Sequence, residues 1–191
     1  MKHLKLFVAL FAMLALGVTN AWAVEETITL SKLGWSAQTV QSSIPATSAT
    51  ISLAKNSAGT APTYYTSDGL RLYGVKKATT GGTISFEPKT GITISKIVFT
   101  HTSSNSGVLT IKTGTGSYSS KTWSGTLTSG NSVSLVSTNN SNSNPQVKIT
   151  KIVITYETSG GGDQPTVSAE PNKGEVGCKE YLWRSKHNRK H

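Results

Sequence analysis

The sequence predicts an all-β protein that folds as an antiparallel two-sheet β-sandwich. Short runs of alternating apolar and polar residues recur along the chain, and a period of two places successive side chains on opposite faces of a strand. Clusters of Ser, Thr, Gly and Asn separate these runs and favour tight turns. No window spaces its apolar residues as an amphipathic helix would. Many short strands between turn clusters are typical of a sandwich.

The first 23 residues predict a secretory signal peptide. They begin with the basic segment "MKHLK", continue with the apolar segment "LFVALFAMLALGV" and end with "AWA", whose small residues suit cleavage after Ala23. The apolar segment is too short for a stable membrane span, and an N-terminal anchor helix is the alternative interpretation. No cysteine follows this segment, which excludes a lipoprotein-type anchor. We therefore expect a protein that is secreted or held at the cell surface, without a membrane span after cleavage.

Ten strands are predicted in one domain, residues 24–158, which is long enough to bury a compact core. The alternating runs occupy residues 26–31, 49–54, 63–66, 70–75, 82–87, 92–100, 108–113, 121–126, 132–137 and 147–157. Two of the connections predict hairpins. A Pro-Lys-Thr-Gly turn joins two runs between Ile84 and Ile94, and a second tight turn lies between Tyr118 and Trp123.

Two of these runs are near copies of each other. The segment "ITISKIVFTH" occupies residues 92–101, and "VKITKIVITY" occupies residues 147–156. In both copies the apolar positions change phase at a polar pair, at 95–96 and at 150–151. A one-residue slip in a strand predicts a β-bulge or a bend. We expect two long, bent strands near one another in one sheet, so the repetition indicates architecture and not a duplicated binding motif.

Five segments carry a family resemblance: "ITLSKLGW", "APTYYTSDGLRLYG", "ISKIVFTH", "TWSG" and "VKITKIVITYE". In this order they resemble a jelly-roll-like β-sandwich accessory module of secreted proteins from gut-dwelling anaerobic bacteria. The resemblance covers most of Glu25 to Glu157. It implies a non-catalytic accessory domain, which in longer chains is often followed by Ig-like or catalytic domains. It implies no particular ligand and no functional residues.

The sequence after the domain changes character. Residues 159–165 are a Gly-rich segment typical of a flexible linker. Residues 166–191 begin with "TVSAEPNKGEV", which is typical of a first strand and turn, and end in a basic segment without alternation. This part is predicted to be a truncated second β module or a flexible, disordered basic tail. Its Cys178 is the only cysteine of the chain, so burial alone must stabilise the sandwich.

Charge and composition argue against several functions. The formal net charge is +10, and in residues 24–158 eleven Lys and Arg accompany five Asp and Glu. The lysines are scattered, as on solvent faces and protected sheet edges, whereas a nucleic-acid groove would cluster them with exposed aromatic rings. His101 is the only histidine of the domain, and no metal-ligand or nucleophile spacing occurs. We expect no enzyme activity, no catalytic residue, no metal, no cofactor and no nucleic-acid partner.

Aromatic side chains are the strongest functional signal, because sugar rings stack their C–H faces on aromatic rings. Tyr118 and Trp123 flank the second hairpin and are predicted to be an exposed ligand-binding pair. Tyr64 and Tyr65 are adjacent, so only one can point outward, and Tyr65 is a further candidate. Arg71 can hydrogen-bond a sugar or a carboxylate, or satisfy a buried carbonyl group. Trp35 and Tyr73 are expected to be structural, Trp35 as a plug at one end of the core.

The sequence thus predicts a secreted non-catalytic module that binds a polysaccharide, a cell-surface glycan or another surface polymer, or acts as a structural or adhesion spacer. The alternative is an accessory domain of a secreted hydrolase or nuclease whose catalytic domain is missing here. The identity of the ligand and the oligomeric state stay open.

Overall fold

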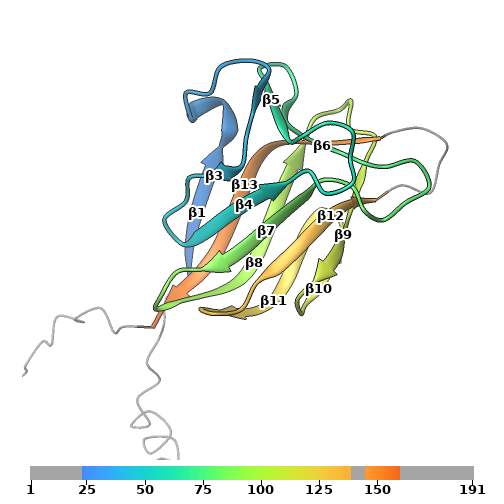
Figure 1. Ribbon diagram of the computed structural model, residues 1–191. Helices are drawn as coiled ribbons and strands as arrows, with labels where there is room; N and C mark the ends of the chain where they lie inside the picture. Colours follow the sequence, from blue (N-terminus) through green and yellow to red (C-terminus); the bar gives the residue numbers. More distant parts are fainter. Residues whose placement is uncertain (1–22, 139–144, 160–191) are drawn as a thin grey trace, which may run out of the picture. The chain divides into compact units, whose positions relative to one another are not determined.

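The computed structural model describes residues 23–138 and 145–159. In these residues two antiparallel β-sheets face each other, so the predicted all-β sandwich is confirmed (Figure 1). The predicted signal peptide, linker and C-terminal segment lie outside the described residues, apart from Ala23 and Ser159. The described part of the chain contains no helix of the length and hydropathy needed to cross a bilayer.

Eight strands form the first sheet, sheet A, and five form the second, sheet B. Sheet A has the order β10-β11-β8-β13-β6-β5-β2, and β1 pairs with β13; sheet B has the order β3-β4-β7-β12-β9. The strands of sheet A are β1 (Val24–Thr29), β2 (Thr39–Val40), β5 (Thr63–Tyr65), β6 (Gly69–Tyr73), β8 (Ile92–His101), β10 (Ser117–Ser119), β11 (Thr122–Thr128) and β13 (Gln146–Thr158). Those of sheet B are β3 (Ser43–Ile44), β4 (Ala49–Ala54), β7 (Thr83–Pro88), β9 (Val108–Thr113) and β12 (Val133–Thr138). A single 3₁₀ turn, η1 (Leu30–Lys32), follows β1 in the described residues.

All ten predicted strands are present, but the predicted hairpin between Ile84 and Ile94 is wrong. β7 belongs to sheet B and β8 to sheet A, so the turn between them carries the chain from one sheet to the other. The turn itself forms, with the Ile92 amide donating to the Lys89 carbonyl oxygen at 3.0 Å. An alternating run, a turn and a second alternating run suit a hairpin and a crossover between sheets equally well. Successive long strands from β6 to β9 alternate between the sheets, as in a jelly-roll-like sandwich.

The two copies of the repeated phrase are β8 and β13, which pair with each other in sheet A. Thr150 of β13 has no partner in β8, because its neighbours Ile149 and Lys151 pair with consecutive residues there. Ser95 of β8 is unpaired with β13 in the same way. Both bulges therefore lie at the predicted phase shifts. The isoleucines beside them are fully buried: Ile94, Ile97, Ile149 and Ile152. The prediction of two bent, inward-packing strands is confirmed.

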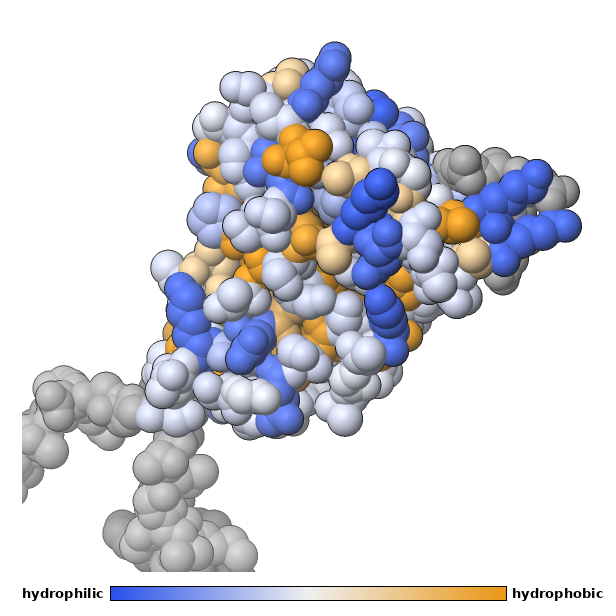
Figure 2. Space-filling model, in the orientation of Figure 1, coloured by the Kyte–Doolittle hydropathy of each residue, from blue (hydrophilic) through white to orange (hydrophobic). Residues whose placement is uncertain are grey.

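The core lies between the sheets and includes a chain of aromatic contacts. Phe86 of sheet B meets Phe99 of sheet A edge to face, with ring centroids 5.9 Å apart. Trp35 is partly buried against the core and packs edge to face on Tyr64 with centroids 5.6 Å apart, as expected for a structural residue. On the outer face drawn in Figure 2, strongly hydrophilic residues occur at several separate places.

Glu26 links the two sheets at the β1 edge. Its carboxylate accepts hydrogen bonds from the Thr47 amide at 2.6 Å, from the Ser48 amide at 2.9 Å and from the Ser48 hydroxyl at 2.5 Å. Thr47 and Ser48 lie between β3 and β4 of sheet B, whereas Glu26 lies on β1 of sheet A. Burial by itself would raise the pKa of Glu26, but these hydrogen bonds outweigh it and hold the pKa below 4.5.

Glu26→Ala is expected to lower the free energy of unfolding by about 2 kcal/mol near pH 7, because it removes a charged acceptor and leaves the polar groups of buried Ser48 unpaired. Urea denaturation measures the change. Glu25→Ala is the matched control, since Glu25 is exposed and accepts one long hydrogen bond, at 3.5 Å from Thr155. It should change stability by less than about 0.5 kcal/mol. Equal losses in the two variants would show that Glu26 does not hold the sheets together.

Candidate functional site

Sheet A opens at the Thr150 bulge. On the edge of β13 away from β8, residues 146–149 pair with β6 and residues 151–156 pair with β1. Thr150 lies between these two segments and pairs with neither neighbour. The opening forms a pocket of about 330 Å³, which we call the Thr150 pocket. It is lined by Thr29, Ser31, Tyr64, Thr66, Gly69, Thr100, Thr150 and Lys151.

The lining of the Thr150 pocket is rich in hydroxyl groups. Five of its eight residues are Ser or Thr, whose hydroxyls can donate and accept hydrogen bonds, and that of Thr150 already donates to the Thr100 carbonyl oxygen at 3.1 Å. Lys151 adds an ammonium group, and Tyr64, which is otherwise buried in the core, also lines the pocket. The volume is at the small end of the range for ligand sites. The pocket therefore suits a small, highly hydroxylated group.

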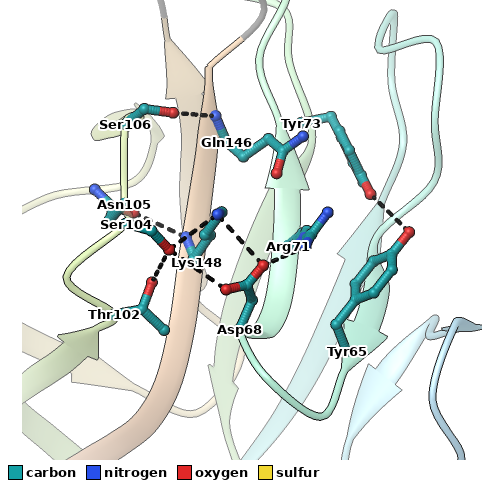
Figure 3. A network of polar contacts seen from close by, with 10 residues as sticks. All are labelled: Tyr65, Asp68, Arg71, Tyr73, Thr102, Ser104, Asn105, Ser106, Gln146 and Lys148. Carbon is teal, nitrogen blue, oxygen red and sulfur yellow. Dashed lines mark hydrogen bonds and ion pairs between the residues drawn. The ribbon is translucent and has the colours of Figure 1, made fainter.

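A charged cluster borders the pocket (Figure 3). We call it the Asp68 cluster, and it consists of Tyr65, Asp68, Arg71, Tyr73, Ser104 and Lys148. The Asp68 carboxylate accepts a hydrogen bond from Arg71, and the Lys148 ammonium lies 3.3 Å from the same carboxylate oxygen. Ser104 donates to the other Asp68 oxygen at 3.4 Å and accepts from Lys148 at 3.0 Å. Asp68 lies in the β5–β6 turn between Thr66 and Gly69, so this turn contributes to both the cluster and the pocket.

Tyr65 and Tyr73 hold Arg71 from the other side. The guanidinium carbon of Arg71 lies 3.8 Å from the Tyr65 ring centroid, which is a cation–π contact. The Tyr73 hydroxyl donates to the Tyr65 hydroxyl at 3.4 Å, and burial, followed by this contact, raises the pKa of Tyr73. The Nε of Arg71 is buried without a hydrogen-bond partner among the described residues. Arg71 is thus held by an ion pair and an aromatic ring, with hydrogen-bonding capacity left over.

The charges of the cluster keep Asp68 ionised. Burial by itself would raise the pKa of Asp68, but Arg71 and Lys148 outweigh it and hold the pKa below 3.8. An ionised carboxylate accepts hydrogen bonds, whereas a general acid or base works best with a pKa near the ambient pH. The described residues contain no group of three or more His, Cys, Asp or Glu that would hold a metal ion.

The β8–β9 loop, which carries Ser104 of the cluster, is held against β13 by hydrogen bonds. The Asn105 side chain accepts from the Lys148 amide at 2.8 Å and donates to the Gly107 carbonyl oxygen at 2.8 Å. The Ser106 hydroxyl accepts from the Gln146 amide at 3.2 Å (Figure 3). These contacts tie the loop to β13 and so place Ser104 beside Lys148.

A larger hollow of about 460 Å³ lies beside β1 and is lined by Glu26, Thr27, Ile28, Thr29, Lys32, Leu33 and Pro45. The Glu26 carboxylate there already accepts three hydrogen bonds from residues 47 and 48. Three of the remaining lining residues are apolar. This hollow offers fewer unused polar groups than the Thr150 pocket, in spite of its size.

Of the four candidates from the sequence, Tyr65 and Arg71 come together in the Asp68 cluster. Tyr64 is buried and Tyr65 half-buried on the outer face, so the predicted division between these neighbours is confirmed. Their part in ligand binding stays a prediction. The sequence did not indicate Asp68, Lys148 or Ser104. Alternation did place Lys148 on the face opposite Val147 and Ile149, but no local pattern shows that β6 pairs with β13.

The expectation that Tyr118 and Trp123 form an exposed pair is wrong. Their hairpin exists, with Ser120 and Lys121 both at positive φ in a two-residue loop, as in a type I′ turn. Trp123 pairs directly with Ile97 of β8, however, and directly opposed residues share a face of the sheet. That face is the core, so the Trp123 ring is fully buried and its Nε1 donates to the Thr115 carbonyl oxygen at 3.0 Å. Tyr118 is half-buried against Phe99, and burial raises its pKa to about 12.

His101 lies at the end of β8, and it makes the stability of the protein depend on pH. Burial and then the charge of Lys121 lower the pKa of His101 to about 4, compared with 6.5 for an ordinary histidine. Between these values the unfolded chain binds a proton that the folded protein does not. The free energy of unfolding should therefore fall as the pH decreases from about 6.5 towards 4.

Urea denaturation at about pH 7 and about pH 5 measures this dependence. The wild-type protein should be less stable at the lower pH, and His101→Gln should reduce the difference. Glu26 and Asp68 also destabilise the fold when they are protonated, but their pKa values lie below 4.5 and 3.8, so they act mainly at lower pH. An unchanged pH dependence in His101→Gln would show that His101 titrates normally in the folded protein.

Comparisons of the chain with protein-family models, with curated proteins and with solved structures found no match. The sandwich architecture is therefore established by the structure alone. The likeness to an accessory module of secreted proteins from gut anaerobic bacteria is a proposal, and so is the function of the pocket and the cluster.

Proposed function

We propose that this chain is a secreted, non-catalytic module that binds a glycan or a similar surface polymer on the outer face of sheet A. The Thr150 pocket and the Asp68 cluster form the binding site. The observation that carries this proposal is a small opening lined by five Ser and Thr residues, next to which the β5–β6 turn holds an Asp68–Arg71 ion pair.

The donors and acceptors of this site suit the hydroxyl groups of a sugar. Each sugar hydroxyl both donates and accepts, as do the hydroxyls of the pocket. Hydrogen bonds to ionised groups are about twice as strong as those between neutral groups, and Arg71, which is paired with Asp68, is a charged donor at this site. Tyr65 and Lys148 hold these two side chains in place, so less conformational entropy is lost when a ligand binds.

The proposal also includes secretion and a place in a larger, modular protein. The predicted signal peptide supports secretion, and the predicted linker after residue 158 supports a place in a larger extracellular protein. The likeness to accessory modules of secreted proteins from gut anaerobic bacteria agrees with both. A small, open pocket has room to bind one or two sugar rings. Weak binding of this kind suits a module that binds a long polymer at many repeated units.

A pocket-filling substitution tests the site. Thr100 is exposed on β8 and lines the pocket, so Thr100→Trp should block it and weaken glycan binding at least about tenfold. Thr110→Trp is the matched control, because Thr110 is exposed on β9 of sheet B and lines neither pocket. Affinity electrophoresis in polysaccharide gels, after a glycan-array screen of the full chain, measures both variants. Absence of glycan binding by the wild-type protein, or an equal loss in the two variants, would overturn the proposal.

A further inference from the structure

The candidate site carries more positive than negative charge. Arg71, Lys148 and Lys151 lie on its strands, and Asp68 is the one acid in the cluster and the pocket lining. Both Asp68 oxygens are already in use, one by Arg71 and Lys148 and the other by Ser104. Asp68 therefore offsets the charge of its two immediate partners only in part. Lys151, which lines the pocket, makes no ion pair among the described residues.

Lys151 lies in the middle of a row of three polar residues on sheet A. It pairs with Thr29 of β1 on one side and with Thr100 of β8 on the other, so the three residues lie side by side across three strands. All three line the Thr150 pocket. One ammonium group and two hydroxyl groups on neighbouring strands offer several hydrogen-bond donors, and charge-assisted hydrogen bonds from an ammonium group favour an anionic acceptor.

We infer that the ligand is an acidic polysaccharide, whose carboxylate or sulfate groups bind at Lys151 in the Thr150 pocket. The inference rests on the proposed function, to which it adds the class of glycan. A neutral sugar would satisfy the hydroxyl groups of the pocket and leave the Lys151 charge without a counter-charge. An acidic sugar satisfies both.

Nucleic acid, the other common polyanion, fits the site less well. Proteins that bind single strands stack bases on exposed aromatic rings along a continuous basic groove. In this site the Tyr64 ring is 3% exposed, and Arg71 covers one face of the Tyr65 ring. The pocket is also too small for an extended groove, at about 330 Å³.

The test compares four polymers with the full chain: polygalacturonate, dextran sulfate, neutral dextran and single-stranded DNA. Calorimetric titration should show tighter binding to one of the two acidic polysaccharides than to neutral dextran and to DNA. Lys151→Gln should weaken that binding about fivefold and leave the melting temperature unchanged. Lys55→Gln, which removes the same charge from an exposed residue outside the site, should have no such effect.

The outcomes separate the inference from the proposed function. Equal binding of neutral and acidic polysaccharides, or binding of a neutral glycan alone, would overturn the inference and leave the proposed function intact. An equal loss in Lys151→Gln and Lys55→Gln would overturn it as well, since it would show a general effect of net charge. Tighter binding of DNA would replace the glycan with nucleic acid. Absence of binding to any glycan would overturn both.

Discussion

Gly69→Ala should lower the free energy of unfolding by more than about 3 kcal/mol, the largest effect expected for so small a change. Gly69 has a φ of +73°, a left-handed conformation that costs alanine about 1–2 kcal/mol. An added Cβ would also lie 2.0 Å from the Ile149 carbonyl oxygen and 2.8 Å from its carbon. Both are backbone atoms of β13, so no side-chain rotation relieves the clash. The substitution must push β6 away from β13 at the Thr150 pocket.

Gly34→Ala is the matched control for this change. Gly34 has almost the same φ, +72°, but an added Cβ there meets no atom within 4 Å. This control should lower the free energy of unfolding by about 1 kcal/mol, which is the cost of the left-handed backbone conformation alone. Urea denaturation of the two variants separates the contributions of backbone conformation and close approach. If both variants unfold at the same urea concentration, the backbones of β6 and β13 do not approach each other as closely as the structure shows.

Trp123→Ala should lower the free energy of unfolding by about 4 kcal/mol, because it leaves a large cavity in the core. Trp123 is fully buried between the sheets. Two glycines make room for it: a Cβ at Gly116 would lie 2.6 Å from its Nε1, and one at Gly125 would lie 2.8 Å from its Cζ2. This fit assigns Trp123 to stability, in contrast to the ligand-binding role that its place in a hairpin predicted.

Trp123→Phe is the informative companion variant. It keeps most of the apolar ring and loses the Nε1 hydrogen bond to the Thr115 carbonyl oxygen, so it should cost roughly half as much as the alanine variant. Glycan binding should be unchanged in any fraction of Trp123→Phe that is folded. A Trp123 variant that keeps full stability but no longer binds glycan would place the ring at the surface and contradict the structure.

Local patterns in the sequence predicted much of the fold. Alternation located ten of the strands, because side chains on a strand with one buried face alternate between core and solvent. The phase shifts at 95–96 and 150–151 predicted both bulges, since an extra residue is what lets a strand resume inward packing. The strands that were missed, β2, β3 and β10, have two or three residues each, too few to show a period.

Pairing between distant strands could not be predicted in the same way. Whether Trp123 faces the core depends on β8, and whether Arg71 meets Lys148 depends on β13. The adjacency of Tyr64 and Tyr65 was a local constraint, and it correctly required that one of them face outward. The sequence did not indicate Asp68, because a turn aspartate and a charge-paired aspartate look the same in one sequence. The bulge at 150–151 was predicted as a feature of the fold and not as part of a site. The Thr150 pocket nevertheless opens at that bulge.

The central claim is that the opening of sheet A at Thr150 is the binding surface. Backbone amide chemical shifts of the isotope-labelled full chain, followed while an acidic oligosaccharide such as trigalacturonate is added, test this claim residue by residue. The largest changes should occur at Gly69, Thr150 and Lys151, which line the pocket. Largest changes at Ser52, Ser85 and Ser134 of sheet B, or no change at any residue, would contradict it.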